Sequence, residues 1–176
     1  MGLNDYQAKM SDRFSTFDHD RDGLIISADV AAMARSILDT YAVPAHSPKA
    51  TDLLDGAHRL FIGLAQETDE DHNGGISRTE FIAGASRRML NNSLGFTAIV
   101  RPWARSVIAI ADTDGDGRVS PDEWSRMLRA MGCTPQGAAG ELRHLVPAQG
   151  GPIHVDAALH SAVVFYTSDQ PRNPYA

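Results

Sequence analysis

The chain of 176 residues contains a single cysteine, Cys133, so it can form no internal disulfide. No stretch reaches the length of about 18 apolar residues that a membrane span needs. The first ten residues lack the basic-then-apolar pattern of a secretory signal. We therefore expect a cytoplasmic protein with no membrane partner.

Dense clusters of lysine and arginine are also missing. The 16 basic residues are outnumbered by 22 acidic ones, and the formal net charge is −6. A chain with this balance is poorly suited to phosphate backbones, so we expect no nucleic-acid partner. The seven histidines have no zinc-ligand spacing. No nucleophilic triad, phosphate-binding loop or acid–base pair lies outside the acidic stretches described next, and we expect no enzymatic activity.

The acidic residues concentrate in three stretches of twelve that repeat one pattern. These are DHDRDGLIISAD at 18–29, DEDHNGGISRTE at 69–80 and DTDGDGRVSPDE at 112–123. Each has Asp, Asp and then Asp or Asn at positions 1, 3 and 5, glycine at position 6, an aliphatic residue at position 8 and an acid at position 12. Crowded carboxylates repel one another in a bare protein. Acidic turns alone do not explain the repeated glycine and closing acid.

Each position of the pattern has a role in holding a hard cation. Oxygens at positions 1, 3 and 5 of a tight loop point to one centre, and glycine permits the positive φ of the bend. Position 7 offers its backbone carbonyl, and the acid at position 12 reaches back with up to two oxygens. An all-oxygen set of this size suits calcium rather than zinc or copper. The sequence therefore predicts three calcium sites, whose ions would offset the net charge of −6.

The predicted calcium ligands are Asp18, Asp20, Asp22, Leu24 and Asp29 in the first loop, Asp69, Asp71, Asn73, Gly75, Ser77 and Glu80 in the second, and Asp112, Asp114, Asp116, Arg118, Ser120 and Glu123 in the third. The third loop has the fullest set, with Ser120 acting through a water. The first loop closes with Asp29, which is one methylene shorter than glutamate. We therefore expect the lowest calcium selectivity there, with tolerance of magnesium.

Helical periodicity before and after each loop predicts three helix–loop–helix units. Ser77 with Glu80, and Ser120 with Glu123, have the spacing of a capping box, so a helix start and a metal site would share residues. Pro102 lies inside the apolar-periodic stretch 96–110, where it should kink the helix.

A fourth unit is expected because such loops pair through a short β-contact at position 8. Helical pattern resumes over 135–146, and the loop VPAQGGPIHVDA at 146–157 has Gly151 at position 6 and Ile153 at position 8. Positions 1, 3, 5 and 12 of this loop carry no carboxylate. We expect this unit to bind no metal and Ile153 to pair with Val119.

These units predict an all-α protein of about eight helices in one compact body. The N-terminal pair would comprise residues 1–91, with the loops 18–29 and 69–80. The C-terminal pair would comprise residues 92–176, with the loop 112–123 and the non-binding loop 146–157. The two halves would pack as one globular unit.

The whole chain resembles the EF-hand superfamily, and within it the bacterial calerythrin-type proteins and the invertebrate sarcoplasmic calcium-binding proteins. The resemblance rests on the length, on four hands of which one is degenerate, on uneven loop starts at 18, 69, 112 and 146, and on Asp29 at position 12. Calerythrin has its non-binding hand second, whereas here the second loop is intact and the fourth is lost. Sites are therefore assigned loop by loop.

The resemblance implies a monomeric intracellular calcium buffer or signal modulator whose partners are calcium ions. The alternative is a calcium sensor that exposes a hydrophobic groove to a protein partner. Sensors tend to line that groove with methionine. The six methionines here form no strong stripe, and the long connection 40–48 suits a closed body, which favours the buffer.

Overall fold

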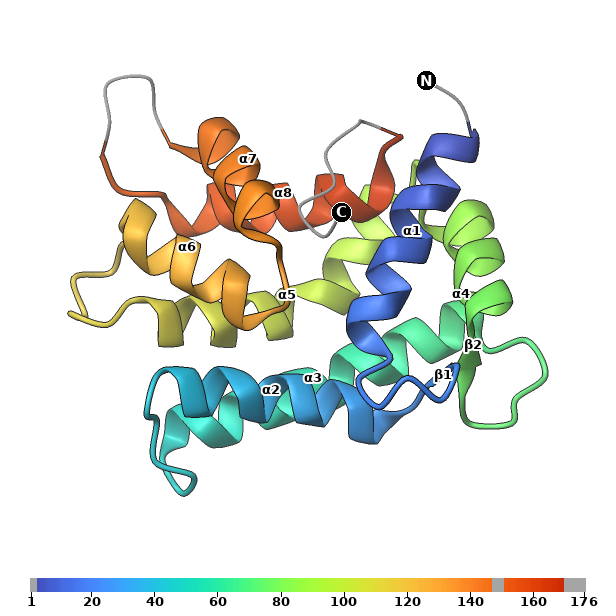
Figure 1. Ribbon diagram of the computed structural model, residues 1–176, viewed down its shortest axis with the longest axis horizontal. Coiled ribbons are helices and arrows are strands. Elements are labelled where there is room, and N and C mark those ends of the chain that lie inside the picture. The colour runs from blue at the N-terminus through green and yellow to red at the C-terminus, as the bar shows by residue number, and fades with distance from the viewer. Residues whose placement is uncertain (1–2, 147–150, 170–176) are drawn as a thin grey trace.

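The computed structural model describes residues 3–146 and 151–169 of the chain. The elements are α1 (Leu3–Phe17), β1 (Leu24–Ile25), α2 (Ser27–Thr40), α3 (Pro48–Thr68), β2 (Ile76–Ser77), α4 (Arg78–Gly84), the π-helix η1 (Ala85–Met89), α5 (Ser93–Ala111), α6 (Pro121–Ala130), α7 (Pro135–Leu145) and α8 (Val155–Thr167). This order confirms the all-α expectation. Four helix–loop–helix units follow one another along the chain, and α5 runs through the middle of the molecule (Figure 1).

Polar caps fix where several helices begin. Ser47, Ser77, Ser120 and Thr134 each accept a hydrogen bond from the backbone N–H three residues further on. This satisfies one of the amide groups that the first turn of a helix leaves without a partner. In α3, α6 and α7 a proline occupies the first helical position, where its missing N–H has no consequence. Both predicted capping boxes are confirmed.

The loops pair as the sequence predicts. β1 and β2 are antiparallel, with Leu24 opposite Ser77 and Ile25 opposite Ile76. In the other half a single antiparallel bridge joins Val119 and Ile153, whose backbone groups exchange hydrogen bonds of 3.3 and 2.6 Å. The fourth unit therefore pairs through Ile153, as expected. Residues 147–150 of its loop, which include positions 3 and 5, lie outside the described residues.

Helices α3 and α5 approach each other closely along their length. A Cβ at Gly63 would lie 2.5 Å from Cγ2 of Ile99, and one at Gly56 would lie 2.9 Å from Oγ of Ser106. Glycine at these two positions therefore allows the backbones to pack at a distance that larger residues forbid. α5 runs through Pro102 without interruption.

The sequence was expected to contain no stretch that is long and apolar enough to cross a membrane, but α5 meets that criterion. Among the described residues it is the one helix that meets this criterion by length and composition, with 19 residues and a hydropathy of 1.2. Its interior carries Arg101, Pro102 and Arg105, and one face packs on α3 and α8. These features are those of a core helix, which shares its length and composition with membrane spans.

The first helix is fastened to the last. Tyr6 donates its hydroxyl proton to the carbonyl of Tyr166 at 2.6 Å, and Lys9 Nζ donates to the carbonyl of Ser168 at 2.6 Å. Arg13 Nε donates to the Tyr166 hydroxyl, also at 2.6 Å. Burial raises the pKa of Tyr6, so its hydroxyl remains a donor. The fourth unit, whose loop has no carboxylate at positions 1, 3, 5 and 12, thus contacts α1, the helix that leads into the first loop.

Candidate metal-binding loops

The three acidic loops bring carboxylates together at two ends of the molecule. The first two loops lie side by side at one end, joined by β1 and β2, and the third lies at the other (Figure 1). In each loop three acidic residues offer one oxygen apiece, and these oxygens lie within 4.8 Å of one another. The groups are Asp18, Asp20 and Asp22, then Asp69, Asp71 and Glu80, and finally Asp112, Asp114 and Asp116.

Two backbone positions in each loop adopt a left-handed conformation. The glycines at position 6 have φ of +93°, +88° and +78°, as the pattern requires. Position 4 also has positive φ, at Arg21 (63°), His72 (56°) and Gly115 (72°). Only the third loop has a glycine at position 4, so this second turn was not predicted for the first two loops. Arginine and histidine are held there although L side chains rarely adopt this conformation.

The loop carboxylates are oriented by their own backbone. In each loop the residue at position 1 accepts from the N–H of position 6, at 3.2, 3.2 and 3.0 Å along the chain. The residue at position 3 accepts from the N–H of position 5 at 3.1–3.2 Å. The residue at position 5 accepts from the N–H of position 7 at 2.8–2.9 Å. These short-range bonds fix the side chains while leaving further lone pairs for a cation.

The acid at position 12 spans each loop from the following helix. Glu123 Oε1 accepts from the N–H of Thr113 at 2.9 Å, and its Oε2 accepts from the N–H of Ser120 at 2.9 Å. Asp29 makes the equivalent pair of bonds, from the N–H of His19 at 3.2 Å and of Ile26 at 2.9 Å. The shorter aspartate therefore reaches the same two backbone positions as glutamate. Its side chain is buried, with 4% exposure.

Hydrogen bonds keep the two closing glutamates ionised. The hydroxyl and N–H of Ser77 both donate to Glu80 and lower its pKa. Burial alone would raise the pKa of Glu123, but hydrogen bonds from Thr113 and Ser120 outweigh it and lower the pKa to about 2. Both side chains therefore carry a full negative charge at neutral pH, which is the form that binds a cation.

Two buried carboxylate oxygens test whether these loops fit a cation. Oδ1 of Asp18 and Oδ1 of Asp69 are buried and have no hydrogen-bond partner among the described residues. Their residues are 7% and 9% exposed. Burying an unpaired anionic oxygen is costly unless a positive charge balances it. Together with an all-oxygen donor set, this arrangement fits a hard divalent ion such as calcium.

The third loop differs at its first position. Both oxygens of Asp112 accept hydrogen bonds, Oδ1 from the N–H of Gly115 at 2.7 Å and Oδ2 from the N–H of Gly117 at 3.0 Å. Glu80 lies within the oxygen group of its loop, whereas Asp29 and Glu123 lie outside theirs. The Ser120 hydroxyl donates to Glu123 at 2.9 Å, so it supports the closing acid directly.

Tyr41 is a contributor that the sequence did not indicate. It follows α2 at the start of the long first connection, and its hydroxyl donates to the backbone carbonyl of Glu123 at 3.0 Å. Burial raises the pKa of Tyr41 to about 12, so the phenol keeps its proton. Arg126 lies over the Tyr41 ring, 4.4 Å from its centroid. Tyr41, at the end of α2, thus holds the first turn of α6, the helix that follows the third loop.

Comparisons with known proteins agree with this geometry. Residues 105–128 match the EF hand family model. One match is the solved structure of a Streptomyces coelicolor calcium-binding protein that acts in prokaryotic calcium-mediated regulation. It is 30% identical, with a TM-score of 0.83 over 92% of this chain and 98% of that one. Calerythrin of Saccharopolyspora erythraea is 22% identical over 159 residues, which is 90% of each chain. The Ca²⁺-regulated photoprotein mitrocomin of the jellyfish Mitrocoma cellularia is 19% identical, with a TM-score of 0.75 over 95% of this chain and 85% of that one, and shares the fold.

Proposed function

This chain belongs to the EF-hand calcium-binding proteins, among which it is calerythrin-like, and we propose that it works as a monomeric calcium buffer or signal modulator in the cytoplasm. Calcium would occupy the three acidic loops through the 17 residues predicted above, and the fourth unit would bind no calcium and would pair with the third. The observation that carries the proposal is the pair of buried oxygens, Oδ1 of Asp18 and Oδ1 of Asp69, that have no hydrogen-bond partner among the described residues. The function is one of binding, although the same fold also occurs in photoproteins.

Buffering is favoured over partner binding by where the methionines lie. Five methionines fall within the described residues, and all are buried in the shared hydrophobic core: Met10, Met33, Met89, Met127 and Met131. A sensor would need to expose such side chains in a groove. The large apolar residues that are exposed, Leu3, Ile62 and Leu94, come from three different helices.

The second candidate, a calcium-dependent regulator, is favoured by one comparison. The Streptomyces coelicolor protein is described as acting in calcium-mediated regulation, and it covers nearly the whole of this chain. For such a role the bonds of Tyr6, Lys9 and Arg13 to the last helix and the residues that follow it would have to break or shift when calcium binds. Calcium would then expose part of the core that the closed form covers.

A calcium titration in millimolar magnesium, followed by calorimetry and by a hydrophobic-surface dye, separates the two candidates. We expect three calcium ions per chain, with dye fluorescence that stays low or falls as the sites fill. A rise in dye fluorescence with calcium would establish the regulator and overturn the buffer. A matched titration of the Asp18→Asn, Asp69→Asn double variant should lose the two N-terminal sites and keep the third. Failure to bind any calcium would overturn both candidates.

A further inference from the structure

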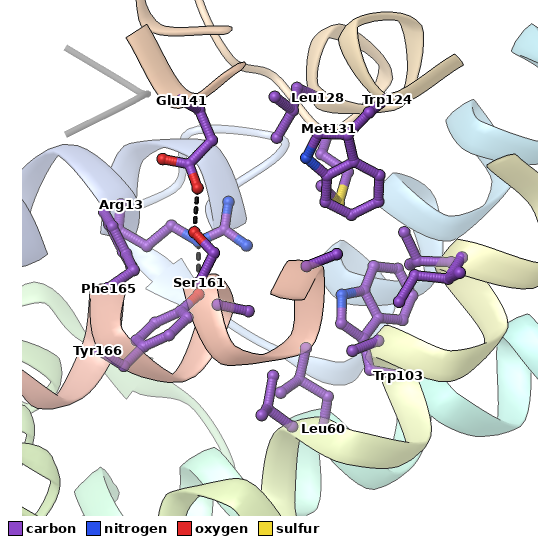
Figure 2. A pocket seen from close by; sticks show the side chains of 16 residues that line it. Arg13, Leu60, Trp103, Trp124, Leu128, Met131, Glu141, Ser161, Phe165 and Tyr166 are labelled. Atoms are coloured by element: carbon purple, nitrogen blue, oxygen red, sulfur yellow. Dashed lines mark hydrogen bonds between the residues drawn. The ribbon is translucent and has the colours of Figure 1, made fainter. Parts of the chain in front are cut away.

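A cavity of about 80 Å³ lies in the C-terminal half of the molecule, enclosed mainly by α5, α6 and α8 (Figure 2). It does not belong to any of the acidic loops. One side is formed by the polar groups of Arg13, Glu141 and Ser161, and the indoles of Trp103 and Trp124 lie across from them. Aliphatic side chains of α5 and α6 form most of the remaining wall. The cavity is therefore mainly apolar, with polar groups gathered on one side.

Trp124 presents a hydrogen-bond donor to this cavity. Its residue is 6% exposed, and among the described residues its Nε1 is a buried donor with no partner. Figure 2 shows the indole nitrogen on the edge of the ring that faces Glu141 and Ser161. A buried indole N–H normally has an acceptor, because leaving it unpaired forfeits the hydrogen bond it makes with water. An acceptor placed in the cavity would satisfy it.

The polar side of the cavity does not supply that acceptor. Glu141 accepts a short hydrogen bond from the hydroxyl of Ser161, and Arg13 donates to the hydroxyl of Tyr166 at 2.6 Å. Arg13 and Glu141 are both buried and carry opposite charges, so together they place no net charge on the cavity. An ionised ligand would have to enter without a counter-charge, which is unfavourable.

We propose that this cavity binds a small uncharged organic molecule with an apolar body and one hydrogen-bond acceptor, which the Trp124 N–H engages. The volume limits its size. A cavity of about 150 Å³ accommodates benzene, so a space of about 80 Å³ suits a body smaller than benzene, of about four non-hydrogen atoms. The apolar body of the ligand would pack against the two indoles and the aliphatic wall, and these contacts would supply the rest of the binding.

Ligand binding would be coupled to the third loop, and this part rests on the proposed function. Trp124 directly follows Glu123, the closing acid of that loop, and its backbone N–H donates to Ser120 at 3.0 Å. A ligand that fixes Trp124 would therefore bias the start of α6. Because coupling between two binding sites is reciprocal, a ligand that changes calcium affinity must have its own affinity changed equally by calcium.

The test uses the calcium-saturated protein and two probes of similar size, acetone, which has an acceptor, and isobutane, which has none. Both tryptophans of the chain line the cavity, so the two indole N–H signals in a nitrogen-15 NMR spectrum report on it directly. Trp124→Phe and Trp103→Phe assign the signals and retain an aromatic ring. We expect acetone to shift the Trp124 N–H downfield, and Trp124→Phe to bind it about 2- to 10-fold more weakly, which is the worth of one neutral hydrogen bond. Trp103→Phe should keep the response.

Three outcomes would overturn the proposal. They are equal binding of the two probes, an unchanged Trp124 signal at millimolar acetone, and equal affinity of the wild type and Trp124→Phe for acetone. Any of them would mean that water or nothing meets the indole N–H. Calcium affinity is then measured with and without acetone. If the third loop binds no calcium, the proposed function fails while binding in the cavity is still measured by the indole signal.

Discussion

Both pairs of loops are joined by antiparallel backbone contacts at position 8, although the loops differ in their acidic residues. In the N-terminal pair both loops are acidic and a two-residue ladder joins them, whereas the C-terminal pair joins an acidic loop, through a single bridge, to one with no carboxylate at positions 1, 3, 5 and 12. Yet the position-8 side chains are equally buried in both, at 0% for Ile25, Ile76 and Val119 and 1% for Ile153. Pairing is therefore carried by apolar burial and backbone hydrogen bonds, which do not depend on the carboxylates. The fourth unit could lose its ligands and still keep its place in the fold.

The pairs also differ in how much they depend on a cation. Asp18 and Asp69 each have a buried oxygen without a partner among the described residues, whereas both oxygens of Asp112 are hydrogen-bonded. Removal of calcium should therefore disturb the N-terminal pair more than the third loop.

The largest effect is expected from neutralising the closing glutamates. Glu80→Gln and Glu123→Gln should each lower the calcium affinity of one site by more than about 100-fold, because loss of an outer-shell partner alone costs about 10- to 100-fold in metal affinity. Glu80→Gln should also weaken the first site through β1 and β2. Glu123→Gln is not expected to affect a second site, because the loop paired with the third has no carboxylate at positions 1, 3, 5 and 12. Calorimetry gives the stoichiometry and affinities. An unchanged first site in Glu80→Gln would contradict the coupling.

Ile153→Ala tests whether the loop 146–157 contributes to the stability of the fold. Removing this buried side chain should lower the free energy of unfolding by about 2–5 kcal/mol and weaken calcium at the third loop, because only the backbone bonds to Val119 remain at the bridge. Ile76→Ala is the matched control in the N-terminal pair. Urea unfolding in excess calcium measures both. A loss for Ile76→Ala without one for Ile153→Ala would show that burial of the Ile153 side chain is dispensable.

Much of this arrangement was predictable because it depends on local chemistry. The glycine and acid pattern placed the loops, Ser77 and Ser120 marked two helix starts, and position 8 identified Ile153 as the partner of Val119. Each of these depends on spacing within about a dozen residues, which a sequence displays directly.

Other features depend on contacts between distant segments, which no periodicity reveals. Helical periodicity did not indicate the π-helical turn Ala85–Met89 that follows α4. The bond from Tyr41 to Glu123 joins residues that the sequence separates by 82 positions. The N–H of Trp124 has no partner within the described part of the chain, and only its surroundings reveal this, since the same tryptophan has the sequence pattern of an ordinary core residue.

Position 1 of the loops offers a test in which the sign of the effect differs. In the metal-free protein Asp18→Asn replaces a buried carboxylate, whose Oδ1 has no partner among the described residues, with a neutral group and should raise the free energy of unfolding by about 1 kcal/mol. Asp112→Asn should lower it, because its two oxygens accept bonds from Gly115 and Gly117 and only one would remain. Urea unfolding in excess chelator measures both. The same sign for both variants would remove this distinction between the pairs.

The smallest effect concerns how the first loop chooses between calcium and magnesium. Asp29 reaches the N–H groups of His19 and Ile26, the two positions that Glu123 reaches in the third loop, from a side chain that is one methylene shorter. Asp29→Glu should open the first loop, favour the larger ion and raise the preference for calcium over magnesium about tenfold. Glu123→Asp is the reciprocal change and should lower that preference at the third loop. Competition titrations at fixed magnesium measure both, and an unchanged preference in Asp29→Glu would mean that the length of the closing acid does not set selectivity here.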